Sequence, residues 1–518
     1  MKQILYSKLG YILGLLLVFP IVVFSESTNM GIFNQSFDIG SKHTKGTVEY
    51  NPQKQEYRLT GAGNQMWIKG ESFYFLNKKM KGNYILQFEF EYINKTRDPK
   101  SSIGIMIRND TSSTSPSIYG AVQGDKVAYL RNRFEKGGAI KEVKMPKKEQ
   151  NTIVQLERRG TQYIFSAGVK GEDFKIVACS DSTLKIIDEA LVGIYLSSHN
   201  ANRKDTVVIR NVRLTVPAKA KFDRNKDTVT SNIEIMDIET GIRKIEYSSP
   251  VMIFAPNWSM DGKSLLYNGN DGLMHNYDLT SKNISVIDTK NAFKNNNDHA
   301  LSWDGKTLGI SNFSDPSKGR KSVVFTVPVT GGTPTQITDE KEHSYFHGFS
   351  LDGKEMLFTG ERDKGNFDIY SINIDTKVET RLTNTPGLDD GSEYSPDGKY
   401  IYFNSVRSGK MQVWRMKPDG SNQERVTNDE WNNWFPHVSP NGKMIVYIAF
   451  GNDVLPGDHP LFKHVSIRLM DLETRKVTVL AHLYGGQGTI NVPSWSPDSK
   501  QIAFISFTTL TPWNLKCY

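Results

Sequence analysis

The segment Tyr394-Ser-Pro-Asp-Gly-Lys-Tyr-Ile-Tyr-Phe403 decides how the second half of this chain folds. Its Asp-Gly pair supplies the positive φ that a tight hairpin turn needs, and the serine two residues before the aspartate can bond the turn backbone. The apolar residues after the lysine predict a short strand. The pattern Ser, any residue, Asp or Asn, then usually Gly occurs six times, beginning at Ser259, Ser302, Ser350, Ser395, Ser439 and Ser496.

The spacing of these turns matches a propeller blade. Their Asp or Asn position advances by 43, 48, 45, 44 and 57 residues, and one four-stranded blade needs about 40–50 residues. The full repeat, which continues through Gln412-Val-Trp-Arg-Met416 and Arg425-Val-Thr427, resembles the unit of the TolB-type (PD40, WD40-like) six-bladed propellers. The resemblance covers about residues 231–508 and implies a six-bladed propeller over 231–518. TolB itself carries an α/β domain ahead of its propeller, whereas the pattern here is β throughout.

Both ends of the propeller region predict how the ring closes. The last repeat supplies only two strands, Val492–Ser496 and Gln501–Phe507. Two further strands, Asn232–Asp237 and Arg243–Tyr247, precede the first repeat. We expect the four to form one blade, because a closed ring leaves no free sheet edge.

The N-terminal half, residues 26–216, predicts a β-sandwich, so the fold class is all-β. Along Tyr84–Tyr92 apolar and polar residues alternate, which is typical of a strand with one buried face. This strand, together with Gly104–Arg108 and Val192–His199, resembles the concanavalin-like (laminin-G-like) sandwiches of exported bacterial proteins. The resemblance implies sugar binding on a concave face, for which Tyr119, Tyr129 and Arg131 are candidates, with packing as the alternative.

The N-terminal residues and a polar linker predict an exported protein with two domains. Residues 1–25 carry two lysines and an apolar run of about 16 residues, which predicts a cleaved signal peptide; the alternative is a membrane anchor, which needs roughly 20. No later apolar stretch approaches that length, so we expect a periplasmic or secreted protein. Residues 217–230 are polar and predict a linker crossed by few contacts.

Composition excludes several classes of function. The chain has 518 residues, 38% of them hydrophobic, and a net charge of +8 from scattered basic residues, which gives no stripe for nucleic acid. Its two cysteines, Cys179 and Cys517, allow one disulfide at most and no thiolate metal site.

The propeller channel is the predicted ligand site. Residues four and five positions before each turn Asp or Asn converge on one mouth of the ring, beside Asp298, Tyr345 and Asp390, and longer loops approach the same mouth. The predicted ligand-binding residues are Asn257, His299, His347, Glu393, His437, His459, Lys463 and Gln487. His299, His347 and His437 are candidate ligands of a divalent metal ion. A passive, water-filled channel is the alternative.

Two alternative functions are consistent with this predicted site. The first is binding of a saccharide or a cell-envelope partner in the funnel, assisted by the sandwich domain. The second is a metal-dependent lyase or hydrolase on a sugar polymer, similar in kind to oligogalacturonate lyase, whose histidines and glutamine resemble this set. Its base would be a histidine or Lys463, and Arg362, Arg407 or Arg468 would neutralise a carboxylate.

Overall fold

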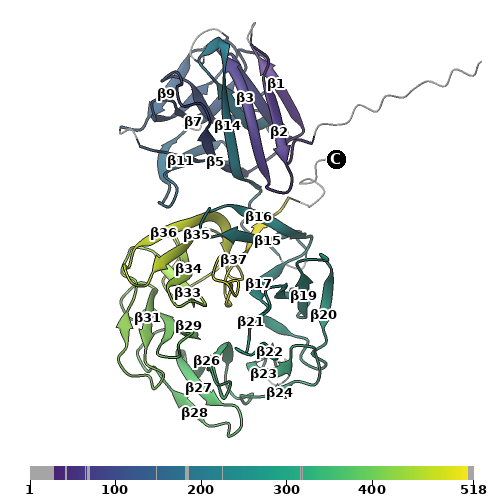
Figure 1. Cartoon of the computed structure of the whole chain (residues 1–518), viewed down its shortest axis with the longest axis vertical. Helices are drawn as coiled ribbons and strands as arrows, with labels where there is room; N and C mark the ends of the chain where they lie inside the picture. Colours follow the sequence, from purple (N-terminus) through teal and green to yellow (C-terminus); the bar gives the residue numbers. More distant parts are fainter. Residues whose placement is uncertain are drawn as a thin grey trace, which may run out of the picture.

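The computed structural model describes residues 29–510 except 41–43, 65, 67–69, 147–148, 181–185, 224–225, 316 and 318. The described chain is all-β and divides into an N-terminal pair of sheets and a ring of six blades (Figure 1). The predicted signal peptide and Cys517 lie outside the described residues, and Cys179 is exposed. Within the described ranges, no helix is long and apolar enough to cross a membrane.

Two seven-stranded antiparallel sheets form the N-terminal domain. The first has the order β1 (Gln35–Ile39), β4 (Phe73–Met80), β13 (Ala190–Ser197), β6 (Ser102–Arg108), β7 (Ser117–Gln123), β8 (Ala128–Arg133) and β9 (Ile140–Lys144). The second has the order β12 (Lys175–Cys179), β11 (Gln162–Gly168), β10 (Ile153–Arg159), β5 (Tyr84–Tyr92), β14 (Asn200–Thr215), β3 (Glu56–Gly63) and β2 (Thr47–Asn51).

The two sheets share one apolar core, as a sandwich requires. The predicted buried face of β5 is confirmed, because Leu86 and Phe88 are fully buried in that core. On the opposite face Glu91 is exposed, but Ile85 and Gln87 are buried as well, so that face is only partly open to solvent. Tyr119, Tyr129 and Arg131 are buried beneath the other face of the first sheet. Their polar atoms bond Met66, Tyr195 and Glu142, so these three side chains pack rather than offer a sugar platform.

The remaining strands form the six-bladed propeller. Five blades are four-stranded: β17 (Ile253–Trp258), β18 (Ser264–Gly269), β19 (Met274–Asp278) and β20 (Ile284–Ile287); β21 (Asn295–Leu301), β22 (Thr307–Phe313), β23 (Ser322–Pro328) and β24 (Thr335–Gln336); β25 (Ser344–Phe349), β26 (Glu355–Asp363), β27 (Asn366–Asn373) and β28 (Glu379–Arg381); β29 (Asp389–Tyr394), β30 (Ile401–Ser405), β31 (Gln412–Met416) and β32 (Glu424–Arg425); β33 (Asn432–Val438), β34 (Met444–Phe450), β35 (Leu461–Asp471) and β36 (Val477–Gly486).

The sixth blade, here called the closing blade, joins both ends of the region. It has the order β16 (Arg243–Ser249), β15 (Thr230–Asp237), β37 (Gln501–Thr508), with Thr230 opposite Thr508. The predicted closure is therefore confirmed for three strands. The fourth predicted strand, 492–496, is wrong: only Trp495 forms a bridge, to Ile502. The segment still lies beside β37, because the N–H of Ala503 donates to the carbonyl of Ser494 at 2.9 Å and the N–H of Ser496 donates to the carbonyl of Gln501 at 2.8 Å, but these bonds do not continue into a ladder before Ser494.

The repeated turn is held by the same hydrogen bonds in all six copies. In the fourth copy Ser395 Oγ donates to Asp397 Oδ1 at 2.7 Å and accepts the N–H of Tyr400 at 3.0 Å. Asp397 also accepts the N–H of Lys399 at 3.1 Å. The serine bond, ahead of charge from Lys399, lowers the pKa of Asp397 to about 2. Each turn is thus a small polar network that fixes the start of the next strand.

Removing the serine of one turn should cost a modest amount of stability. Ser395→Ala is expected to lower the free energy of unfolding by about 1–2 kcal/mol, because a part-buried N–H and a carboxylate each lose a partner. Denaturant titration checks this, with Ser408→Ala, an exposed serine that makes only a 3.4 Å contact to Lys410, as the control. Equal loss in both variants would contradict the role of the turn.

More contacts join the two domains than we expected from the polar composition of the linker. In Figure 1 the closing blade and β35–β36 face the second sheet of the N-terminal domain. A strand bridge joins Gly171 to Val479. The polar and ring contacts across this junction include Arg213–Glu234 at 2.6 Å, Arg468–Asp173 at 2.6 Å, His464–Glu157 at 3.3 Å and a Phe174–His482 stack at 4.2 Å. The prediction of few crossing contacts is wrong, because outward charges of the second sheet find partners on the propeller.

Candidate functional site

A repeated β-bulge decides which side chains reach the propeller channel. In each of the five four-stranded blades the register between the first two strands shifts, for example between Asp390 and Glu393 and between Trp434 and His437. Ala255, Gly391 and Phe435 have φ of 53°, 62° and 53° at equivalent places in three blades. A bulge re-aims the neighbouring side chains. The predicted ring residues therefore divide into two sets.

The first set connects neighbouring blades instead of lining a cavity. His437 contacts Glu393 of the preceding blade through Nδ1 at 2.6 Å and the carbonyl of Ile490 through Nε2 at 2.7 Å. Asn257 donates to the carbonyl of Pro493 at 2.5 Å and accepts the N–H of Leu301 at 3.3 Å.

His299 belongs to the same set. Its Nε2 lies 3.5 Å from the carbonyl of Leu266, and its side chain is buried. Burial lowers the pKa of His299 to about 4, so the imidazole is neutral. Asn257, His299, Glu393 and His437 thus have structural roles between blades.

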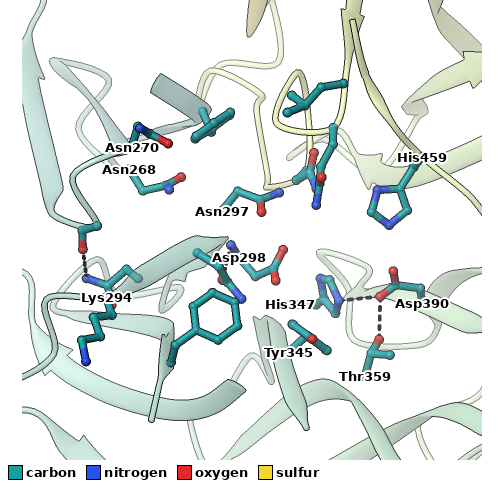
Figure 2. Close-up of a pocket in the computed structure, with 18 of the residues that line it drawn as sticks. Asn268, Asn270, Lys294, Asn297, Asp298, Tyr345, His347, Thr359, Asp390 and His459 are labelled. Carbon is teal, nitrogen blue, oxygen red and sulfur yellow. Dashed lines mark hydrogen bonds and ion pairs between the residues drawn. The ribbon is translucent and has the colours of Figure 1, made fainter. Parts of the chain in front are cut away.

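The second set surrounds a cavity of about 610 Å³ at one mouth of the ring (Figure 2). Its walls combine aromatic rings, side-chain amides, carboxylates and imidazoles. Three of the predicted residues line it: His347, His459 and Gln487. The polar residues that join them include Asn268, Asn270, Asn295, Asn297, Asp298, Tyr345, Thr359, Asp390 and Asn491.

His347 and Asp390 form an ion pair on the cavity wall. His347 Nε2 lies 2.8 Å from Asp390 Oδ1, which also accepts a 2.7 Å hydrogen bond from Thr359 Oγ1. Burial is the largest single influence on His347 and lowers its pKa, but the hydrogen bond to Asp390 and the nearby carboxylate charges together outweigh burial, so the net shift is upward. Burial is likewise the largest single influence on Asp390 and raises its pKa, but the charge and hydrogen bond of His347, with smaller contributions from His459 and Thr359, together outweigh burial and hold the pKa at about 2. Asp390 is therefore ionised at neutral pH, and the pairing favours the protonated form of His347.

Asp298 lies near this pair and differs from Asp390 in its protonation state. Burial raises its pKa to about 7, and the charge of Asp390 adds to the rise while that of His347 opposes it. Its carboxyl has no hydrogen-bond partner in the part of the chain that the structure describes. One cavity thus holds an ionised carboxylate and a carboxyl that is half protonated near neutral pH.

Several amide and imidazole atoms around the cavity are left without partners. Asn268 Oδ1, Asn297 Nδ2 and His459 Nδ1 are buried and make no hydrogen bond among the described residues. Burial lowers the pKa of His459, whose ring packs edge-on against Trp434 at 4.4 Å. Buried polar groups are normally bonded, so these atoms are suited to a bound ligand or to water.

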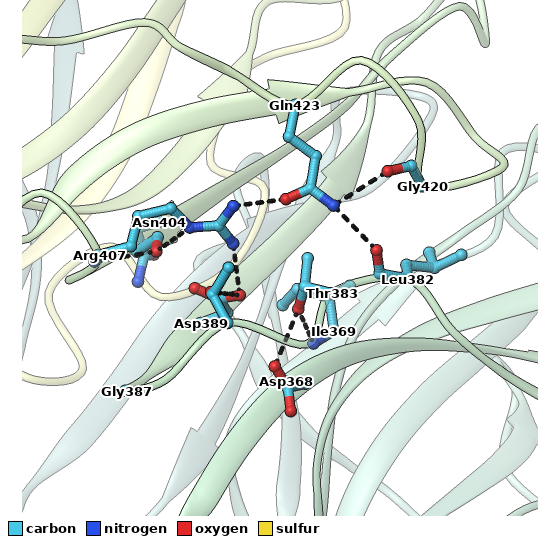
Figure 3. Close-up of polar contacts among 12 residues, drawn as sticks. Asp368, Ile369, Leu382, Thr383, Gly387, Asp389, Asn404, Arg407, Gly420 and Gln423 are labelled. Carbon is cyan, nitrogen blue, oxygen red and sulfur yellow. Dashed lines mark hydrogen bonds and ion pairs between the residues drawn. The ribbon is translucent and has the colours of Figure 1, made fainter.

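The remaining predicted residues lie outside this cavity. Lys463 pairs with Asp453 at 3.0 Å and lines a separate hollow beside Phe222 of the linker. Arg362 pairs with Glu379 at 2.8 Å, and Arg468 pairs across the domain junction. Figure 3 shows Arg407 held by Asp389 and Gln423 within its own blade. None of these cations faces the cavity, so they are not its base or its charge-neutralising groups.

The three candidate metal ligands are not assembled as one set. Both ring nitrogens of His437 are used by protein partners, and only His347 of the three lines the cavity. Over the described ranges, no group of three or more His, Cys, Asp or Glu side chains is arranged to hold a metal ion. The donor set therefore does not fit the metal-dependent lyase or hydrolase.

Sequence reasoning located the mouth but missed most of the amides. Asp298, Tyr345 and Asp390 could be found because they precede the ring positions in the repeat. Asn268 and Thr359 each lie seven residues after the Asp of their turn, in the second strands β18 and β26, which the repeat rule did not consider. A search of this position of the second strands for polar residues would have found them.

The propeller region is similar to a known protein family and to known proteins. The TolB beta propeller domain, PD40, matches residues 299–482. The uncharacterized protein Atu1656 of Agrobacterium fabrum is 44% identical over 281 residues, which are 54% of this chain and 93% of that protein. A solved structure from Agrobacterium tumefaciens, provisionally described as TolB, is 44% identical with a TM-score of 0.51, over 54% of this chain and 98% of that one.

A more distant relative extends the comparison to a Tol-Pal protein. The Tol-Pal system protein TolB of Francisella tularensis subsp. mediasiatica is 29% identical over 277 residues. The match spans 43% of this chain and 59% of that protein, so the likeness concerns only part of each. Six blades, the repeated Ser-x-Asp turn and the extent of the Agrobacterium match together show that this chain belongs to the TolB-type PD40 β-propeller family.

Proposed function

We propose that this chain is an exported binding protein whose propeller cavity takes a saccharide. The observation that carries the proposal is the cavity of about 610 Å³, whose lining combines side-chain amides with aromatic rings. Amides offer donors and acceptors to sugar hydroxyls, and rings pack against the apolar faces of sugar rings. Export rests on the signal-like pattern of residues 1–25, which would bring the propeller to the periplasm or the cell exterior.

The unpartnered atoms support a ligand with many hydroxyl groups. Asn268 supplies an acceptor, Asn297 a donor and Asp298 a carboxyl, each without a protein partner in the described chain. A hydroxyl both donates and accepts, so one sugar can satisfy all three kinds of atom. The contribution of the N-terminal domain is to hold β35–β36 and the closing blade, which border the same ring.

A binding experiment with a single amide variant tests the proposal. Isothermal titration calorimetry of the full chain against oligosaccharides of glucose, mannose, galactose and N-acetylglucosamine should find a ligand among them. Asn297→Ala should lower the affinity for that ligand by about five- to tenfold, because the variant removes one buried hydrogen bond.

The control is Asn283→Ala in an exposed turn of the first four-stranded blade, which should bind as the wild type does. Absence of binding by every sugar, or equal binding by both variants, would remove the saccharide proposal and leave a protein partner of the envelope as the occupant to test.

A further inference from the structure

A second pocket lies at the junction between the two domains, away from the propeller mouth. Its volume is about 500 Å³, and it is lined by β5 and β7, by the segment 150–152, by Lys170 and by Thr240 and Ile242 of the closing blade. Thr240 accepts a hydrogen bond from Lys170 at 2.5 Å, which closes one side of the pocket. A ligand here would contact both domains at once.

Most charges in this pocket are already neutralised. Glu91 pairs with Arg210 at 2.9 Å, and Glu89 accepts a 2.6 Å hydrogen bond from Asn211 and lies 3.8 Å from Lys170. These contacts account for both carboxylates of the lining. Two cations of the lining, Arg97 and Lys126, make no ion pair with any described residue, although the charge of Arg97 acts on the carboxyl of Asp205 outside the pocket.

Arg97 is fixed in place but not satisfied. Its guanidinium carbon lies 4.4 Å from the centre of the Tyr92 ring, and its Nε is buried with no hydrogen bond among the described residues. The neighbouring carboxyl of Asp205 lies 3.7 Å from Arg203 and does not line the pocket. Lys126 makes no ion pair in the described part of the chain. A planar guanidinium held against a ring is suited to a carboxylate.

Asn151 marks the inner wall of the pocket. Its side chain is only 4% exposed, and neither Oδ1 nor Nδ2 has a hydrogen-bond partner within the described residues. An amide buried in this way costs free energy unless something in the pocket bonds it. Gln123, which is 7% exposed, adds a second amide to the same lining.

We propose that this junction pocket is a second ligand site, which binds a carboxylate-bearing sugar such as a uronic acid. Arg97 and Lys126 take the carboxylate, and the amides of Asn151 and Gln123 take ring hydroxyls. The pocket holds one or two sugar rings in volume, and it shares no lining residue with the propeller cavity. The proposal is therefore independent of the saccharide in the funnel.

The test is calorimetric titration of the full chain with D-glucuronate, D-glucose and acetate. Glucuronate should bind at least tenfold more tightly than either of the others, because only it offers both the carboxylate and the hydroxyls. Its affinity should fall as salt is added. Equal affinity for acetate and glucuronate overturns the sugar assignment, and no binding of glucuronate overturns the site and leaves water as the partner of Asn151.

Variants locate the binding in this pocket. Asn151→Asp removes two N–H donors and adds a negative charge that repels the carboxylate of glucuronate. This variant and Arg97→Gln should each weaken glucuronate binding at least tenfold. Lys126→Gln changes a half-buried side chain that makes no ion pair among the described residues, and it should weaken glucuronate binding severalfold. This variant keeps the test decisive if the buried variants misfold. Arg58→Gln, an exposed arginine of β3 outside the pocket, is the matched control.

Asn297→Ala distinguishes this site from the propeller cavity and should leave glucuronate binding unchanged. Binding that survives in Asn151→Asp, Arg97→Gln and Lys126→Gln, or that is lost in Asn297→Ala or Arg58→Gln, would overturn the assignment to this pocket.

Discussion

Glu234→Ala is expected to lower the free energy of unfolding by about 3–5 kcal/mol, the loss typical of breaking a buried ion pair. Glu234 lies in β15, its side chain is fully buried, and its carboxylate contacts Arg213 at 2.6 Å and Arg243 at 3.7 Å. Ser506 of β37 donates a further hydrogen bond at 2.6 Å. The variant leaves two guanidinium groups with little solvent and no carboxylate, at the point where the closing blade meets the N-terminal domain.

The pH dependence of stability checks the same residue. Burial alone would raise the pKa of Glu234, but Arg213 and Arg243 outweigh burial and hold it at about 2, against an ordinary 4.5. A lowered pKa in the folded state stabilises the protein above pH 4.5, and this contribution is lost as the pH falls from 4.5 towards 2. The wild type should lose about 3 kcal/mol more than the variant over that window.

Guanidinium unfolding at pH 7 and at acidic pH measures both effects. Glu239→Ala, in the exposed turn between β15 and β16, is the matched control and should change the free energy of unfolding by less than about 0.5 kcal/mol. If Glu234→Ala unfolds like the control, the ion cluster does not stabilise the closing blade.

Asp298→Asn, unlike Glu234→Ala, should raise the free energy of unfolding, and it should do so at alkaline pH. Burial raises the pKa of Asp298 to about 7, whereas the unfolded chain ionises near 3.8. The stability gained from holding this proton is fully present below pH 3.8 and is lost as the pH rises to 7. At pH 8 the wild type holds a desolvated carboxylate, so the amide variant should be more stable by up to about 4 kcal/mol.

The difference between Asp298→Asn and the wild type should shrink as the pH is lowered and vanish near pH 4. Denaturant titrations at pH 4, 6 and 8 measure it, with Asp375→Asn in an exposed turn as the control. A difference that does not vary with pH would show that Asp298 is ionised throughout. A carboxyl kept in a cavity at such a cost is typical of a residue retained for ligand binding.

The propeller could be predicted from the amino-acid sequence, because each blade is encoded by residues that lie close together along the chain. The Ser-x-Asp turn needs only residues within five positions of one another, as Ser395, Asp397 and Tyr400 show, so its recurrence predicts both the hairpins and their number. The alternation along β5 likewise fixed its buried face. The closing of the ring followed from counting strands, and only the segment around Pro493 failed to form its strand.

The tertiary structure decided the site and the domain junction, because both depend on contacts between distant residues. His437, four residues before the Asn of its turn, contacts Glu393, whereas His347, five residues before the Asp of its turn, lines the cavity. His299 has the same repeat position as His347 and yet lies between two blades, so the position in the repeat does not by itself decide what a side chain faces. Whether a polar residue such as Arg213 faces water or a partner depends on which surface packs over it, and Glu234 lies 21 residues further along the chain. Such partners cannot be read from alternation, since period two assigns a face to each residue but not what covers that face.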